Sequence, residues 1–211
     1  FNICPLSYQL LRFTAGRIFH KTMQKQAADN TLTFTLHHSI NEIDALQWQA
    51  LAEQAGPFLQ YQWLKALEDT HCVDGKINKQ SDWRTGRQTG WQTAFWSGSL
   101  NGELKIVVPG YLKTHSYGEY VFDHSWANAY HQHGKDYYPK WIAAIPFTPV
   151  TGPRILIASD VSAAQWHSLV THINDWASDN QYSSCHWLFN PLDSQTNFAK
   201  LGFSSRFSVQ F

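Results

Sequence analysis

The chain has 211 residues, of which 43% are hydrophobic and 15% are charged, so it is too apolar for a disordered protein and long enough to bury a sizeable core. Sixteen basic residues balance sixteen acidic ones, which excludes a chain-wide positive field that would hold nucleic acid or an anionic membrane. Three cysteines lie far apart without a CxxC motif, which favours reduced thiols and a cytoplasmic location over a disulfide framework.

Residues 1–30 show no periodic pattern, and the single methionine is Met23. We therefore expect a leader over residues 1–30 that is non-native or disordered, followed by one domain over residues 31–211. The order of charged and apolar residues in this leader does not fit a signal peptide. No run of about 18 apolar residues predicts a transmembrane helix. Alternation at residues 207–211 predicts an unfinished strand, as in a domain truncated before a second half.

The first part of the domain is predicted to hold one strand and two helices. Alternation at residues 32–36 indicates a half-buried strand. Asn41 can cap a first helix that buries Leu46. A second helix follows Pro57 and is predicted to direct Trp63 inward.

A hairpin is predicted next, after a polar loop at residues 75–90 that we expect to be mobile. Its strands are expected at residues 91–96 and 104–111, and Asn101 with Gly102 is a typical hairpin turn. The remaining predicted elements are a strand at 119–122, a helix from Ser125 to Gly134, a central strand at 154–158, a helix around 166–176, a strand at 185–189 and a helix at 193–201. This order favours an α/β or α+β fold with helices on the faces of a sheet.

Residues 113–154 differ from the rest of the chain, because polar, titratable and aromatic residues alternate there without a core period. Ordering such a stretch is expensive unless it lines a site. The alternative interpretation is a surface loop rich in aromatic residues.

Three blocks of this region resemble a family of predicted N-acyltransferases, the FemAB-like peptidoglycan biosynthesis/recognition proteins. The blocks are residues 115–123, 137–140 and 146–154, and the segments 56–59 and 109–113 also fit. The resemblance implies a GNAT-like mixed sheet flanked by helices, in tandem in the complete protein, with this chain as its first half. It implies transfer of an acyl or aminoacyl group to the amine of a small molecule or peptide. The acyl donor would be acyl-CoA, an acyl carrier protein or an aminoacyl-tRNA.

The phosphate-binding loop typical of acetyl-CoA enzymes, Q/R-x-x-G-x-G/A, is not found at the expected junction between a strand and a helix. That junction spans residues 157–162 and carries Asp160, which would repel a phosphate. Ser162 and Gln165 predict a simple capping box there. We therefore do not expect this half to bind CoA in the standard manner.

Amine attack on an acyl donor needs a proton acceptor and donors for the oxyanion. The candidate proton-handling residues are His115, Glu119, Asp123 and Tyr138. The candidate substrate-binding residues are Trp126, Tyr130, Tyr137, Lys140, Phe147, Thr148, Thr151 and Arg154, with the last three polar residues and Lys140 as donors to a carboxylate or phosphate. If the segment is extended, Glu119 and Asp123 lie ~13 Å apart, too far for a proton-sharing pair.

Alternatives remain open for these residues. Glu119 and Asp123 could be scaffold carboxylates paired with lysine or arginine. The whole chain could be a non-catalytic recognition module that binds cell-wall peptide or glycan through its aromatic residues. Histidines at 124, 131 and 133 invite a zinc interpretation, but no HExxH motif or cysteine spacing supports one, so no metal ligand is assigned. Cys185 and His186 are neighbours on a strand and should face opposite sides.

Overall fold

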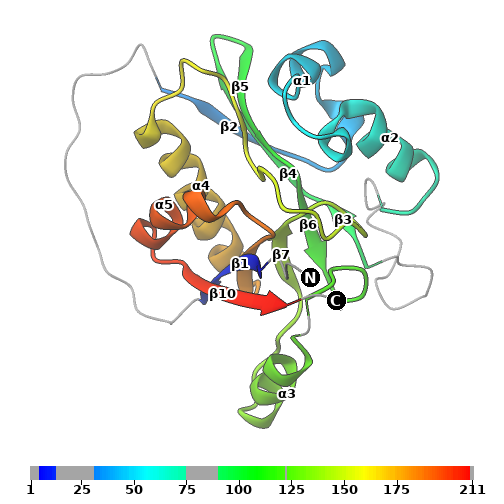
Figure 1. Cartoon of the computed structure of the whole chain (residues 1–211), viewed down its shortest axis with the longest axis vertical. Coiled ribbons are helices and arrows are strands. Elements are labelled where there is room, and N and C mark those ends of the chain that lie inside the picture. The colour runs from blue at the N-terminus through cyan, green and yellow to red at the C-terminus, as the bar shows by residue number, and fades with distance from the viewer. Residues whose placement is uncertain (1–4, 13–30, 75–89, 122, 210–211) are drawn as a thin grey trace.

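The computed structural model of the chain describes residues 5–12, 31–74, 90–121 and 123–209. Its strands form two sheets with helices on both faces (Figure 1). The mixed α+β fold expected from the sequence is confirmed. Within the described ranges, every helix is too short or too polar to traverse a lipid bilayer.

The smaller sheet has four antiparallel strands in the order β2–β4–β5–β8. These are β2 (Thr33–His37), β4 (Phe95–Leu100), β5 (Glu103–Val108) and β8 (Leu156–Ile157). Asn101 and Gly102 connect β4 to β5 with φ values of 52° and 84°, which is the left-handed backbone that the predicted turn requires.

The larger sheet has six strands in the order β10–β1–β9–β7–β6–β3. Their bounds are β1 (Pro5–Arg12), β3 (Gln92–Thr93), β6 (Gly110–Lys113), β7 (Lys140–Ala143), β9 (Ser184–Leu188) and β10 (Ser204–Val209). Neighbouring strands are antiparallel except β7 and β9, which are parallel.

A single bent hairpin joins the two sheets. β3 continues into β4 past Ala94, and β5 continues into β6 past Pro109. At the bend the amide of Ala94 donates to the carbonyl of Gly110 at 2.8 Å. Proline has no amide to donate to a ladder, so the two strands predicted as continuous are each divided here between two sheets.

Helices cover both faces of the sheets and bury a separate hydrophobic cluster on each. They are α1 (Ala45–Leu51) and α2 (Tyr61–Asp69) on one side and α4 (Ala163–Asp179) and α5 (Gln195–Lys200) on the other (Figure 1). The first cluster includes Trp48, Leu64, Tyr111, Ile142 and Leu188, and the second includes Trp141, Leu169, Ile173, Trp187 and Phe198. Alternate residues of β7 and β9 thus point to opposite cores. Short 3-10 helices span Ile40–Glu42, Pro57–Leu59 and Leu192–Ser194.

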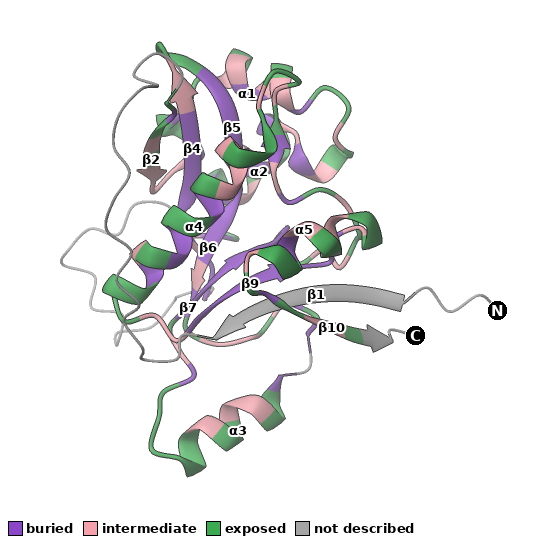
Figure 2. Cartoon of the chain, turned by 90° about the vertical axis from the view of Figure 1, so that its left-hand side faces the viewer, coloured by how far each residue is buried: buried purple, intermediate pink, exposed green. Residues whose placement is uncertain are grey.

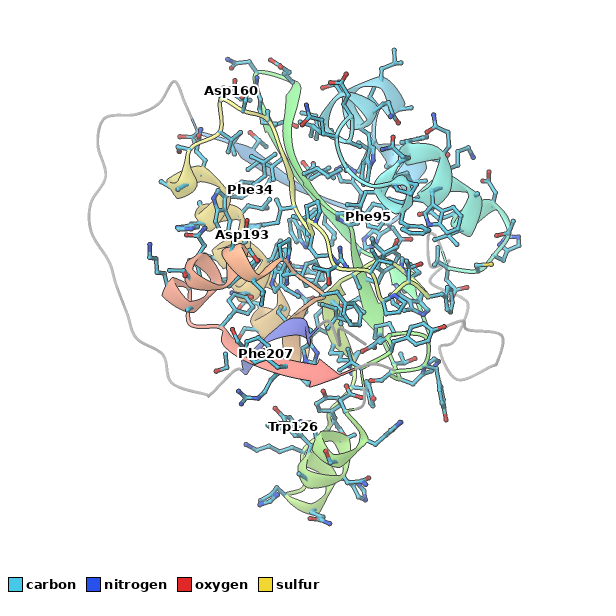
Figure 3. All side chains as sticks on the ribbon, in the orientation of Figure 1. Phe34, Phe95, Trp126, Asp160, Asp193 and Phe207 are labelled. Carbon is cyan, nitrogen blue, oxygen red and sulfur yellow. The ribbon has the colours of Figure 1, made fainter. Side chains whose placement is uncertain are left out.

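Helix α3 (His124–Gln132) projects away from the sheets and has no buried residue (Figures 1 and 2). Its base lies near β10, where the guanidinium of Arg206 stands 5.6 Å from the ring of Trp126 (Figure 3).

Some predicted helix details are wrong. Helix α1 is capped by Asp44, whose carboxylate accepts from two amides of the first turn, whereas Asn41 lies in the preceding 3-10 helix. Leu46 is 82% exposed and Trp63 is also exposed, because the helices turn Trp48 and Leu64 towards the core instead.

Two predicted strands are also corrected. The described residues 119–121 form a turn rather than a strand, and Phe122 lies outside the described residues. Strand β8 is at the edge of the smaller sheet and not in its centre. The loop predicted at residues 75–90 lies outside the described residues apart from Gly90.

Strand β1 comes from the stretch expected to be a leader. It lies between β9 and β10 and pairs with both in antiparallel register, with Tyr8 opposite Leu188 on one side and Arg206 on the other. Residues 1–4 and 13–30 lie outside the described residues. Leu6, Tyr8 and Leu10 alternate with Ser7 and Gln9, so this stretch carries a short strand signal that the prediction of a leader did not use.

Candidate functional site

Two lysines on neighbouring strands form the floor of the candidate site. Lys113 ends β6 and Lys140 begins β7, and the two stand directly opposite each other in the antiparallel register. Both share the sheet face that carries Tyr111 and Ile142, because residues two apart on a strand lie on one side. Both lysines are buried, so each positive charge needs a partner.

Lys140 meets that need with two carboxylates. Its Nζ lies 2.8 Å from Oε2 of Glu119 and 2.6 Å from Oδ2 of Asp123, and it also donates to Ser116 at 2.9 Å. Burial would lower the pKa of Lys140, but the two carboxylates raise it above its usual value. The loop before α3 thus folds back over β7, and Glu119 and Asp123 converge on one atom. The ~13 Å separation expected for an extended segment is therefore wrong.

Asp123 accepts more hydrogen bonds than Glu119, all of them through Oδ2, while its buried Oδ1, like Oε1 of Glu119, has no hydrogen-bond partner among the described residues. Its Oδ2 accepts hydrogen bonds from Ser116 at 2.9 Å, from the Tyr137 hydroxyl at 2.8 Å and from Lys140. Burial alone would raise the pKa of Asp123, but Lys140 and these hydrogen bonds hold it below its ordinary value. Asp123 is consequently a fixed anion and a poor proton acceptor near neutral pH.

Glu119 is held less completely. Its Oε2 is bonded to Lys140, while its buried Oε1 has no hydrogen-bond partner. Burial raises the pKa of Glu119 in spite of the nearby lysines. By contrast, the buried carboxylate of Glu68 accepts from Ser39, from the amide of Ile40 and from Thr93. Glu68 is fully satisfied scaffold, whereas Glu119 retains an unused acceptor.

Among the described residues, no carboxylate is in hydrogen-bond contact with Lys113. Its Nζ donates to the carbonyl of Tyr117 at 3.0 Å and lies 3.9 Å from the centre of the Trp91 ring. Burial lowers the pKa of Lys113, Glu119 opposes this effect and the charge of Lys140 adds to it, and the resulting pKa is about 7. Lys113 is therefore poised to exchange a proton near neutral pH.

The other proton-handling candidates lie at the edge of this cluster. The Tyr138 hydroxyl is 2.7 Å from Oγ of Ser116, and burial raises the pKa of Tyr138. His115 is half buried, and its Nδ1 accepts from the amide of Tyr117 at 3.2 Å. Burial lowers the pKa of His115, and the nearby charge of Lys113 adds to this effect. The ring therefore lies within electrostatic reach of the lysine pair.

Two loops with unusual backbone cover the cluster. Gly118, Tyr120 and Phe147 have positive φ values of 79°, 57° and 57°. Glycine adopts this backbone freely, whereas Tyr120 and Phe147 are strained there, and such strain is retained where the surroundings or a function require it. The ring of Phe147 lies 5.5 Å from that of Trp91. Tyr117, Tyr120 and Phe147 are 73%, 47% and 42% exposed. The cover thus presents aromatic surface outside and charged groups inside.

The remaining substrate-binding candidates separate into two groups. The ring of Tyr130 packs on that of Tyr137 at 5.1 Å, and Tyr137 is itself buried. These two rings therefore pack against each other rather than forming an open binding surface. Thr148 donates to the carbonyl of Pro146, and Thr151 is exposed. Arg154 is buried in the same loop and donates to main-chain carbonyls. None of these contacts links Arg154 to the lysine cluster.

The sequence patterns assign no role in the site to two of its members, Lys113 and Ser116. A detectable signal for Lys113 was its place on a strand otherwise made of core residues, because an unpaired lysine there must be buried. Cys185 and His186 do face opposite sides, since Cys185 belongs to the second hydrophobic cluster and His186 stands opposite Ile142.

The junction where a phosphate loop was sought is occupied by helix-capping contacts. Ser162 and Gln165 form the expected capping box at the start of α4. Asp160 lies 2.8 Å from Nζ of Lys105. Across the described ranges, no three His, Cys, Asp or Glu side chains are grouped closely enough to hold a metal ion.

Comparison with models of known protein families gives a match. A family model named FemAB-like and described as peptidoglycan biosynthesis/recognition matches residues 39–211. The matched region contains the complete lysine–carboxylate cluster and both covering loops. No curated protein matches the chain.

Proposed function

Because the chain belongs to the FemAB-like family of peptidoglycan biosynthesis/recognition proteins, we propose that it takes part in the transfer of an acyl or aminoacyl group to an amine. The proposed site is the cluster of Lys113, Glu119, Asp123 and Lys140 under the loops of residues 114–121 and 144–154. The acceptor is a small molecule or a peptide.

The unpaired oxygen of Glu119, on an acid whose pKa is raised, carries this proposal. A buried carboxylate oxygen without a donor costs about 1–3 kcal/mol, and within the described ranges neither this oxygen nor Oδ1 of Asp123 has a hydrogen-bond partner. An acceptor amine would supply the missing N–H. The cluster also separates two carboxylates into a fixed anion, Asp123, and a carboxylate whose pKa is raised, Glu119. Such a separation of pKa values is typical of a site that assigns different roles to two acids.

The proposed chemistry uses Glu119 as the general base. The lone pair of the neutral amine attacks the acyl carbonyl carbon, a carbon–nitrogen bond forms, and the bond to the donor's leaving group breaks. The amine proton passes to Oε1 of Glu119. Lys140 stays charged beside both carboxylates and orients them, while Lys113 offers a cation or a proton to the developing oxyanion.

Access to Glu119 requires movement of the covering loop. Tyr120, whose positive φ is strained for a residue other than glycine, lies in that loop, and strained backbone is a common feature of loops that switch. The closed loop would exclude water from the acyl donor during transfer. The donor itself stays open among acyl-CoA, acyl carrier protein and aminoacyl-tRNA, and the capping box at α4 argues against a standard CoA site in this chain.

An assay with radiolabelled donors of the three classes tests the proposal. Each donor is incubated with the chain and with an amine acceptor such as a lysine-containing peptide, and transfer is followed as label in the acceptor. We expect amide formation with one donor class. Absence of transfer with all three classes, under conditions where each donor stays intact, would count against catalysis by this chain.

A recognition module is the second candidate, and the exposed aromatic residues of the cover favour it. Tyr117, Tyr120 and Phe147 are exposed to solvent, and exposed aromatic side chains are suited to contacts with a sugar or a peptide. Under this alternative the charged cluster only supports the loops. Binding of muropeptide fragments without any turnover, lost in Tyr117→Ala and Phe147→Ala variants, would support recognition over catalysis.

A further inference from the structure

Arg154 is a buried cation without an anion. It is 2% exposed, and its guanidinium donates only to main-chain carbonyls, those of Val150 at 2.6 Å, Gly152 at 3.1 Å and Pro153 at 3.0 Å. Its Nε has no hydrogen-bond partner. Burial lowers the pKa of Arg154 to about 9, and no neighbouring carboxylate in the described part of the chain opposes this effect.

A scaffold arginine would normally differ from this one. Burying a charge is costly unless an opposite charge compensates it, and Lys140 in the same protein has two carboxylates within 2.8 Å. The carbonyls that hold Arg154 all belong to the loop just before it. They are neutral acceptors, which bind a guanidinium less strongly than a carboxylate does.

We infer that Arg154 binds one carboxylate group of the acceptor substrate, with its planar N–H donors exchanging the loop carbonyls for the two carboxylate oxygens. This inference rests on the proposed function for the identity of the ligand as the acceptor. The loop carbonyls hold the guanidinium in place until the ligand arrives. Val150 to Pro153, the loop residues that precede Arg154, are at least partly exposed. A short displacement of this loop would therefore give the carboxylate access to the guanidinium.

The charge balance selects a carboxylate rather than a phosphate. Arg154 supplies a single positive charge, whereas Lys113 donates to the carbonyl of Tyr117 and Lys140 is neutralised by Glu119 and Asp123. A carboxylate would neutralise that charge, whereas a phosphate monoester would leave a buried negative charge. Arginine is also suited to carboxylates because both groups are planar and can form two parallel hydrogen bonds.

Nuclear magnetic resonance can observe the Nε–H group of Arg154 directly. The resonance is assigned by its loss in an Arg154→Lys variant of the whole chain. N-acetylglycine is the probe, because it has a carboxylate and no free amine. We expect a saturable shift of the Arg154 Nε–H signal with N-acetylglycine, and no comparable shift with glycinamide or inorganic phosphate at equal ionic strength. An Arg206→Lys variant, which changes an arginine near Trp126, should retain the full response.

Two results would overturn the inference. One is an Arg154 signal that stays unchanged throughout the titration in the folded wild-type chain. The other is an equal response to phosphate, which would make the site a general oxyanion site.

A thermal measurement provides a second test, since N-acetylglycine at ~100 times its Kd should raise Tm by about 5 °C in the wild type. An Arg154→Met variant that folds should not respond. The probe has no amine to acylate, so failure here leaves the acyl-transfer proposal intact, and absence of acyl transfer leaves carboxylate binding intact.

Discussion

Lys113 and Lys140 show how position alone gives two identical side chains opposite properties. Both are buried and face each other across β6 and β7. Lys140 has two carboxylates and its pKa is raised, while Lys113 has a carbonyl and a ring, and burial lowers its pKa to about 7. The two pKa values differ because the loop that carries Glu119 and Asp123 folds towards Lys140 rather than Lys113. The sequence pattern does not predict the direction of this loop.

The lowered pKa of Lys113 makes stability depend on pH. Between about pH 7 and its unfolded value, the unfolded chain binds one more proton than the folded chain, so this residue makes stability rise with pH. The stability advantage of a Lys113→Met variant over the wild type should therefore be largest below pH 7 and decrease towards pH 10, by up to about 1.4 kcal/mol per pH unit. Urea unfolding across this range measures it, with exposed Lys65→Met as a control. A difference that does not change with pH would contradict the pKa of Lys113.

Asp123 should make stability rise with pH as Lys113 does, but in a lower pH range. Its pKa is lowered, so its contribution is present above the unfolded value near pH 4 and is lost as the pH falls through the folded value. Asp123→Asn removes one partner of Lys140, and we expect a loss of about 3 kcal/mol at pH 7.

The control for this variant is Asp69→Asn, which breaks the exposed pair of Lys65 and Asp69 and should cost less than about 1 kcal/mol. Denaturant unfolding at pH 7 and pH 3 compares the two variants. Equal losses for both at pH 7 would mean that the buried cluster adds no more to stability than a surface pair does.

At the scale of elements, the covering loop depends on a glycine that no other residue can replace. A Cβ at Gly118, where φ is 79°, would lie 2.7 Å from the ring of Phe147 and 3.0 Å from Nε1 of Trp91. Gly118→Ala should therefore displace the loop and lower Tm by more than Gly102→Ala does. Gly102 has a similar φ of 84° but open space around it. The Tm loss of Gly102→Ala therefore measures the backbone strain alone, and any additional loss in Gly118→Ala measures the steric clash. Equal Tm losses in thermal unfolding would show that the loop is not packed on Phe147.

The sequence predicted those elements whose signal is local. The spacing of Leu169, Ile173 and Ala177 and the capping box at Ser162 specify helix α4, and Asn101 with Gly102 specifies the hairpin turn. The covering loop could not be predicted, because its shape depends on ion pairs with Lys140 that join residues far apart in the sequence. The aromatic and polar block at residues 113–154 stays a predicted site, and its sequence pattern does not contain the pairing of Lys113 with Lys140 across β6 and β7.

At the scale of the whole molecule, the position of β1 has a direct consequence. The strand lies between β9 and β10, so its removal leaves two strand edges without partners. We expect deletion of residues 1–12 to lower Tm and to cause association, in contrast to deletion of a disordered leader. Thermal unfolding and light scattering of the two chains measure this. An unchanged Tm and a monodisperse monomer would show that β1 is dispensable and that β9 and β10 need no strand between them.

Lys113 and Lys140 lie opposite each other on β6 and β7 of the larger sheet, and the loop that ends at Arg154 follows β7 along the chain.

The central claim is that Glu119 accepts the proton of the amine. The most direct test is the rate of acyl transfer by Glu119→Gln, compared with Glu103→Gln, which changes an exposed carboxylate paired with Lys105. The account predicts that Glu119→Gln loses a factor of ~100 or more in rate while remaining folded, and that Glu103→Gln keeps wild-type activity. Equal activity of the two variants would contradict it.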